Sequence, residues 1–267
     1  MAKLSISPAW DESRAILARD GKLIGAVALA MLVLPGIILN VVIPRVPSGE
    51  MPPLGLWVAV AFAALVISSI GQLSIIRLAI GPHVTVGDAI AHGGRRVLPF
   101  LGAFLIWTVP LFIVASLLYA IVRSDPAHPS AAAAIGLLAV TVGGGFLAVR
   151  LILLSAVASA ENLSPIAILR RTWALTSGNW WRLFVFLLLS AIGALALIWA
   201  VGSVVGVVAR LAFGPLTPVS VGGLIVIIVA QLLTALIYVV LFVMLARIYA
   251  QLSGAVGTQA RVPSSGI

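Results

Sequence analysis

Long apolar stretches separated by short polar ones dominate the sequence. Each stretch reaches or exceeds the ~20 residues that an α-helix needs to cross a hydrocarbon core about 30 Å thick. They lack the alternation of apolar and polar positions that is typical of a membrane β-strand. The six stretches are residues 23–43, 56–80, 97–122, 131–158, 183–208 and 219–249. The pattern therefore predicts an all-α polytopic membrane protein with about six transmembrane helices.

Three polar motifs indicate an internal repeat. Ser7-Pro8, Thr85 and Ser164-Pro165 are spaced 78 and 79 residues apart, and each precedes an odd-numbered apolar stretch. Ser and Thr cap helix starts, and Pro favours the first helical position. We expect three pseudo-repeats, each a short interfacial helix followed by a transmembrane hairpin. Their approximate ranges are 7–84, 85–163 and 164–250, in a single transmembrane domain 1–255 that precedes a short flexible tail, 256–267.

Composition supports a membrane protein and sets its expected orientation. The 267 residues are 62% hydrophobic and 9% charged, against roughly 25% charged residues in a soluble domain. The net charge of +9 comes from Lys and Arg that lie mostly in loops, twelve on the side of both termini and three on the other. The positive-inside rule accounts for this distribution better than nucleic-acid binding does. Both termini are therefore expected in the cytoplasm, and no signal peptide is expected, because acidic residues precede the first stretch.

The sequence offers little for catalysis. None of the seven acidic residues lies within an apolar stretch, although ionisable groups at depth mark proton relays and intramembrane proteases. Metalloprotease, nucleophile-elbow and phosphate-loop motifs are absent. His83, Asp88 and His92 share one loop, but a metal site needs three or four ligands in fixed geometry, so they are interpreted as interfacial residues. Cysteine is absent. No catalytic residue, cofactor or metal is therefore predicted.

One charged residue, Arg150, lies well inside a stretch. The guanidinium could reach the interface along its own aliphatic stem. Alternatively, Gln72, Arg150 and Gln231 recur at spacings of 78 and 81 in the second span of each unit. If those helices face one another, the three residues form an intramembrane polar cluster that organises packing or receives an anionic lipid headgroup.

Basic and aromatic residues collect on the predicted cytoplasmic face. Such residues set topology and form interfacial belts, and they are also typical contacts of anionic phospholipid. The sequence is compatible with both roles. The predicted anionic-lipid contacts are Arg95, Arg96, Arg170, Arg171 and Arg182.

The most distinctive segment is ENLSPIAILRRTWALTSGNWWR, residues 161–182. An acidic residue and Ser-Pro precede an Arg pair, followed by Thr-x-Gly-x-Trp-x-Arg. This segment and the Ser7-Pro8-Ala9-Trp10 opening resemble the bacterial glycerophosphoryl diester phosphodiesterase membrane domain family and the related YciC-like six-span proteins. The resemblance implies a six-span protein of the bacterial inner membrane. It implies no catalysis, because the family's phosphodiesterase activity belongs to a separate soluble barrel that this chain lacks.

The leading hypothesis is a non-enzymatic membrane scaffold or lipid-associated module. The alternative is a passive transporter or lipid-handling protein with a polar site around Arg150. Membrane lipids, including anionic phospholipid, are the expected partners, whereas a protein partner and the oligomeric state are not predicted.

Overall fold

The structure, a computed structural model, describes residues 5–44, 46, 52–81, 84–124, 130–215, 217 and 220–254. Within these residues every element of regular secondary structure is a helix. The helices are α1 (Ile6–Ala28), a π-helical turn (Leu29–Val33), α2 (Leu34–Val42), α3 (Leu56–Ile80), α4 (Val86–Ser124), α5 (Ala131–Arg150), α6 (Leu154–Ala160), α7 (Pro165–Thr176), α8 (Trp180–Phe213) and α9 (Val221–Leu252). His83 and the predicted tail 256–267 lie outside the described residues.

Six of these helical stretches are long and apolar enough to cross a membrane, which confirms the predicted fold class. They are Ile6–Val42, Leu56–Ile80, Val86–Ser124, Ala131–Ala160, Trp180–Phe213 and Val221–Leu252. The chain is therefore an all-helical, multi-pass membrane protein. Helices of 37 and 39 residues are about 55–60 Å long at 1.5 Å per residue, so the first and third extend well beyond a ~30 Å hydrocarbon core.

The three predicted units differ in how their first helix begins. Helices start at Ile6, Val86 and Pro165, at spacings of 80 and 79 residues. A separate short helix precedes the span only in the third unit, as α7, because the chain turns at Gly178 with φ of 81°. In the first two units the expected interfacial helix continues directly into the span. Ser7 lies inside α1 rather than at its cap, which is Ser5.

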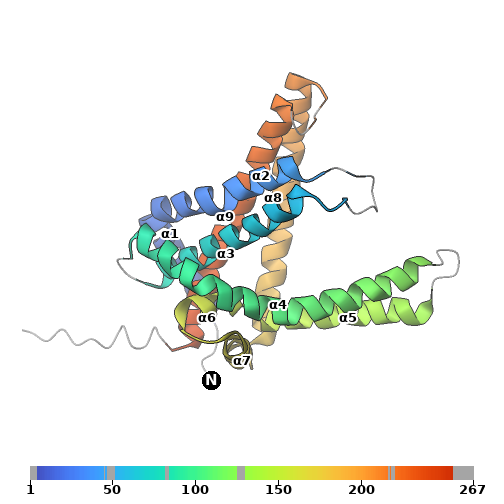
Figure 1. Cartoon of the computed structure of the whole chain (residues 1–267). Coiled ribbons are helices and arrows are strands. Elements are labelled where there is room, and N and C mark those ends of the chain that lie inside the picture. The colour runs from blue at the N-terminus through green and yellow to red at the C-terminus, as the bar shows by residue number, and fades with distance from the viewer. Residues whose placement is uncertain are drawn as a thin grey trace, which may run out of the picture.

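Three helix hairpins diverge from a common base (Figure 1). The hairpins are α2/α3, α4/α5 and α8/α9, and the base combines α1, α6 and α7 with the adjoining parts of α3, α4 and α9. Far from the base the apolar side chains are exposed, as at Phe112 (68%) and Leu211 (83%). Exposure of this extent is unfavourable in water but carries no hydrophobic penalty in lipid, so the outer parts of the hairpins are suited to a bilayer.

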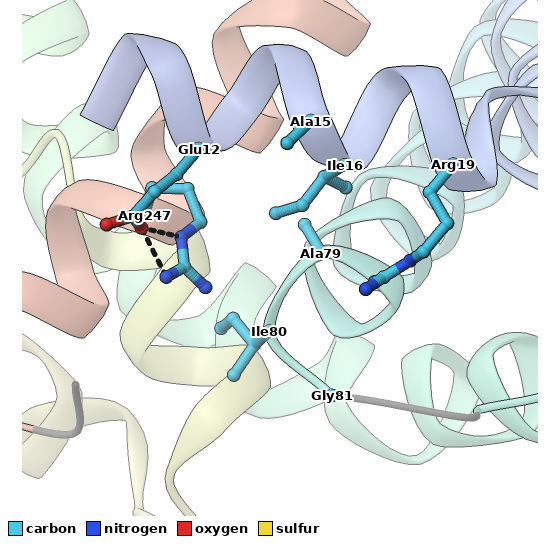
Figure 2. Close-up of a pocket in the computed structure, with 8 residues that line it drawn as sticks. All are labelled: Glu12, Ala15, Ile16, Arg19, Ala79, Ile80, Gly81 and Arg247. Carbon is cyan, nitrogen blue, oxygen red and sulfur yellow. Dashed lines mark hydrogen bonds and ion pairs between the residues drawn. The ribbon is translucent and has the colours of Figure 1, made fainter. Parts of the chain in front are cut away.

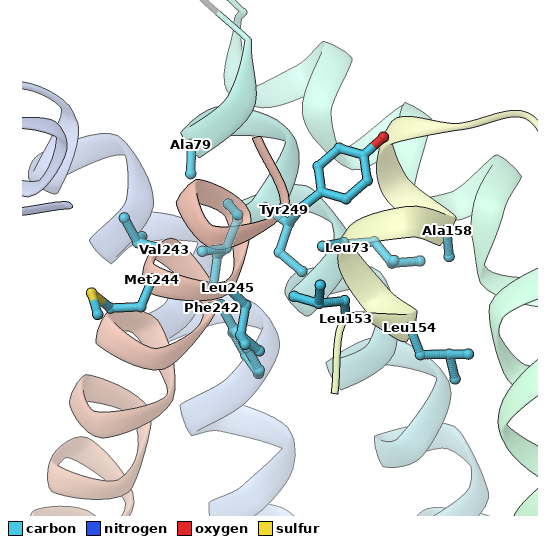
Figure 3. Close-up of a cluster of buried hydrophobic side chains, with 14 of the residues drawn as sticks. Leu73, Ala79, Leu153, Leu154, Ala158, Phe242, Val243, Met244, Leu245 and Tyr249 are labelled. Atoms are coloured by element: carbon cyan, nitrogen blue, oxygen red, sulfur yellow. The ribbon is translucent and has the colours of Figure 1, made fainter. Parts of the chain in front are cut away.

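The buried core lies in the base. Leu73 of α3 and Leu153, in the turn before α6, lie beside α9, which contributes Val243 and Leu245 (Figure 3). All four are at most 3% exposed. The core therefore joins the second helices of all three units at one end of the molecule.

Helices α3 and α4 approach closely within this base. A Cβ at Gly93 would lie 2.7 Å from the carbonyl oxygen of Ile70 and 2.7 Å from the Ser74 hydroxyl oxygen. Ser74 Oγ donates to the carbonyl oxygens of Ile70, at 2.7 Å, and of Ala89, at 3.1 Å. Only glycine permits this backbone approach. The neighbouring Gly94 faces open space, since no other helix of the described residues comes within 4 Å of a Cβ at that position.

We expect Gly93→Ala to destabilise the protein by about 1–3 kcal/mol, because the added methyl group forces α3 and α4 apart. Gly94→Ala is the matched control, and it should be neutral or stabilising by up to about 1 kcal/mol, since Ala is the better helix former. Thermal unfolding of the detergent-solubilised protein measures both. Equal effects of the two substitutions would contradict the close approach.

Candidate functional site

Arg150 lies where α5 ends, at the corner between α5, α7 and α8. Its guanidinium carbon is 4.9 Å from the ring centroid of Trp173 and 5.5 Å from that of Phe146. Its Nη1 is 3.5 Å from Ser177 Oγ. Thr176 Oγ1 donates to the Arg150 carbonyl oxygen at 3.0 Å, which ties the end of α7 to the end of α5. Arg150 is thus held at a helix end and against aromatic rings.

The aromatic rings around Arg150 form a continuous stack. Trp180 stacks on Phe146 at 5.4 Å and on Phe184 at 5.2 Å between ring centroids. Phe146 and Arg150 are four residues apart on α5, and Trp180 and Phe184 are four apart on α8, so each pair shares a helix face. We call Phe146, Arg150, Trp173, Trp180 and Phe184 the arginine–aromatic cluster.

Polar atoms in and beside this cluster are buried without a hydrogen-bond partner among the described residues. They are Arg150 Nε and Trp180 Nε1, together with Thr172 Oγ1 on the adjacent α7. A buried donor without an acceptor costs about 1–3 kcal/mol. Two of these atoms are N–H donors, so the chemistry that would satisfy them is an oxygen acceptor.

The two glutamines predicted to join Arg150 have other surroundings. Gln231 packs against α2, where a Cβ at Gly36 would lie 2.5 Å from Gln231 Oε1. Gln72 is half-buried, eight residues before the end of α3 at Ile80, whereas Gln231 lies 21 residues before the end of α9 at Leu252. Counted from these two helix ends, the positions of Gln72 and Gln231 differ by thirteen residues. The three-residue cluster stays a prediction.

Four of the five predicted lipid-contacting arginines are exposed, namely Arg95, Arg170, Arg171 and Arg182. Arg171 also forms an ion pair with Glu161 at 2.9 Å. Arg96 is buried. The donors of Arg96 are directed at the chain that follows α6, so its place in the structure is that of an internal anchor rather than a surface contact.

Arg96 holds the end of α6 through several hydrogen bonds. Its Nε donates to the Ala158 carbonyl oxygen at 2.9 Å and its Nη1 to Asn162 Oδ1 at 2.6 Å. Its Nη2 donates to the carbonyl oxygens of Glu161 and, at 3.3 Å, of Leu163. The last carbonyl groups of a helix lack partners within that helix, and a cation there is favourable. We call this arrangement the Arg96 clamp.

The clamp continues into a wider polar network. One helical turn before Arg96, His92 Nε2 lies 2.8 Å from the Ser159 carbonyl oxygen. The Glu161 carboxylate accepts from Tyr249 Oη at 2.8 Å and from Arg171 Nε at 2.9 Å. These contacts connect α4, α7 and α9 through the α6–α7 connection.

Among the described residues, His92 and Asp88 belong to no group of three or more potential metal ligands. Asp88 instead pairs with Thr85, whose Oγ1 accepts from the Asp88 N–H at 3.1 Å and donates to Oδ2 at 2.6 Å. The bond from the Asp88 N–H to Thr85 Oγ1 is the helix cap expected of Thr85 at the start of α4.

A pocket that sequence reasoning missed lies between α1, α3 and α9 (Figure 2). Its volume is about 230 Å³. The lining residues are Glu12, Ala15, Ile16, Arg19, Ala79, Ile80, Gly81 and Arg247. Glu12 Oε2 accepts from Arg247 Nε at 2.6 Å. The spacing of Glu12, Ile16 and Arg19 on one helix face was a signal in the sequence, but the partner residues are far away in the chain.

Comparison of the chain with protein-family models, curated proteins and solved structures gives no match. The function of this chain is therefore inferred from its own residues.

We expect Arg96→Leu to destabilise the protein by about 3 kcal/mol or more, because it removes the donors to several buried oxygen atoms. The matched control is Arg95→Leu, which removes an exposed arginine from the preceding position of the same helix and should change stability by less than about 0.5 kcal/mol. Unfolding in detergent, followed by tryptophan fluorescence, compares them. Equal loss in both variants would show that Arg96 has no special structural role.

Proposed function

We propose that this chain is a non-enzymatic, lipid-associated scaffold module of a bacterial inner membrane, in keeping with the family that residues 161–182 resemble. The observation that carries the proposal is the arginine–aromatic cluster, where the partly buried Arg150 guanidinium lies against Trp173 and Phe146 and forms no ion pair with a carboxylate among the described residues. The acceptor we assign to this guanidinium is a phosphate or ester oxygen of a membrane lipid.

The position of the cluster supports a lipid oxygen as the acceptor. Trp is enriched where the hydrocarbon core meets the headgroups, and Arg side chains near helix ends extend to the same level. Trp181, next to the cluster, is 70% exposed and Trp173 is 42% exposed, so an approaching lipid meets aromatic surface. A charged donor to phosphate makes a strong, short hydrogen bond. The cation–π contacts with Trp173 and Phe146 hold the guanidinium in place for it.

The diverging hairpins support association with lipid rather than a closed channel. Almost none of the most apolar part of α4 and of α8 is buried within the protein, so bilayer lipid can contact both helices directly. The alternative, passive transport past Arg150, would be favoured by a cavity beside that residue. The pocket described above is lined by α1, α3 and α9 and does not include Arg150.

We expect Arg150→Leu to lower the amount of co-purifying phospholipid about tenfold, since a charge-assisted hydrogen bond contributes about 1.5–3 kcal/mol. Arg150→Lys should give an intermediate value, because lysine keeps the charge but loses the planar fork. Native mass spectrometry of gently solubilised protein measures bound lipid.

Arg123→Leu is the matched control for this experiment. Arg123 also contacts an aromatic ring, that of Tyr119 at 5.7 Å, but it is exposed near the end of α4 away from the base. Its loss should leave lipid retention unchanged. If Arg150→Leu retains as much lipid as the original protein while remaining folded, the lipid role of the cluster is refuted.

We also propose that both termini face the cytoplasm, because the basic residues gather at the base end of the helices. Cysteines introduced at Ser5 and Ser253 should react with a membrane-impermeant maleimide only after the inner membrane is permeabilised. A cysteine at Ser130, at the opposite end of the fourth span, should react in intact spheroplasts. The chain has no native cysteine, so each signal belongs to one site. The reverse labelling pattern would overturn this orientation.

A further inference from the structure

The pocket between α1, α3 and α9 combines an apolar wall with charged groups. Ala15 and Ile16 of α1 face Ala79 and Ile80 of α3 across it. Glu12, Arg19 and Arg247 supply the charges (Figure 2). Because both kinds of surface meet in one hollow, the pocket is suited to an amphiphile rather than to a simple ion.

The charged residues of the pocket keep hydrogen-bonding atoms outside the ion pairs that they form. Arg247 donates to Glu12 through Nε and Nη2. Arg19 uses Nε, at 3.0 Å, and Nη2, at 2.7 Å, on Asp20. Each guanidinium carries five N–H donors, and Nη1 of both arginines is not engaged in these pairs. The carboxylate of Glu12 likewise keeps Oε1 outside its pair with Arg247.

The pocket lies at the depth where apolar spans end. Arg19 is four residues before Leu23, where the uncharged part of the first span begins, or about 6 Å at 1.5 Å per residue. Ile80 ends α3, and Arg247 lies five residues before the end of α9. The start of the first span and the ends of the second and sixth are on the same membrane side. Lipid headgroups lie at this level of a bilayer.

The size of the pocket restricts the ligand to a headgroup. Its volume of about 230 Å³ is below the ~300–1,000 Å³ that is usual for sites of drug-sized ligands. A whole lipid does not fit, whereas a phosphodiester headgroup does, with its acyl chains leaving the pocket toward the bilayer.

We propose that this pocket binds the headgroup of a phospholipid whose phosphodiester is joined to a primary amine. The phosphate oxygens accept from Nη1 of Arg19 and Arg247, and the ammonium group donates to Glu12. Ile16 and Ile80 contact the glycerol and the first carbons of the chains. Glu12 gives the selectivity, since a carboxylate in the pocket disfavours a second negative charge and favours a hydrogen-bonding cation. The site is separate from the arginine–aromatic cluster and does not depend on its function.

The test uses the full-length protein in detergent, incubated with equal amounts of three dioleoyl phospholipids and followed by native mass spectrometry. The lipids carry ethanolamine, choline or glycerol headgroups. The ethanolamine lipid should be retained about tenfold more than the choline lipid, whose trimethylated nitrogen has no N–H to donate. Equal retention of those two lipids would overturn the proposal.

Substitutions of pocket residues, each with a matched control outside the pocket, test whether the lipid binds there. Arg19→Gln should lower retention of the ethanolamine lipid about tenfold, whereas Arg14→Gln, an exposed arginine on another face of α1, should not. Glu12→Gln should remove the preference for ethanolamine over choline. Ala15→Leu narrows the pocket without changing its charge and should lower retention, with the exposed Ala18→Leu as its control. Equal effects within each matched pair would overturn the proposal.

Two further experiments complete the test. The first distinguishes lipid bound in the pocket from lipid bound at the arginine–aromatic cluster, and the second distinguishes a lipid headgroup from a free phosphate. Arg150→Leu should leave the ethanolamine preference intact, so failure of the cluster and failure of the pocket are distinguishable. Inorganic phosphate and water-soluble glycerophosphoethanolamine, each added at millimolar concentration, should not displace the lipid. Complete displacement by either compound would show that the pocket takes a soluble phosphate instead, and would overturn the lipid assignment.

Discussion

The Arg96 clamp is the interaction on which the arrangement of the base depends. A helix that ends inside an apolar protein leaves its last carbonyl oxygens without partners, and lipid cannot supply them. Arg96 provides donors to the end of α6 and to the connection that follows it. That connection fixes where α7 begins, and α7 in turn places Trp173 against Arg150. Loss of this one guanidinium would therefore disturb residues well beyond its own contacts.

The base and the hairpins meet two different physical requirements. In the base, side chains pack closely and polar groups form hydrogen bonds with other parts of the protein. Ser159 Oγ, for example, donates to the Leu73 carbonyl oxygen at 3.0 Å. In the outer hairpins the backbone is satisfied within each helix, and the side chains need only an apolar solvent. Gly202 and Gly206 illustrate the difference, because no other helix of the described residues comes within 4 Å of a Cβ at either position. Small residues there leave the outer part of α8 smooth without packing it against a neighbouring helix.

The sequence predicted the six spans because hydropathy alone decides them, but it could not separate Arg95 from Arg96. Two adjacent arginines look alike in a loop, and only the helical phase of α4 buries one and exposes the other. Gln72 lies eight residues before the end of α3 and Gln231 lies 21 before the end of α9, a difference that a fixed sequence spacing does not register. The pocket escaped prediction for another reason. It joins Glu12 to Arg247, residues 235 positions apart, and no local pattern records such a contact.

The two candidate lipid sites differ in a way that follows from their surroundings. Among the described residues, the Arg150 guanidinium contacts two aromatic rings and the Ser177 hydroxyl group and forms no ion pair with a carboxylate, so ring faces attract the cation. In the pocket, Glu12 lies against Arg247 and lowers the net positive charge. An isolated cation at the membrane surface attracts anionic lipid without much discrimination, whereas an ion pair with unused donors and acceptors can distinguish headgroups by hydrogen bonding. The arginine–aromatic cluster would thus bind anionic lipids through its positive charge alone, whereas the pocket would discriminate between headgroups through the geometry of its hydrogen bonds.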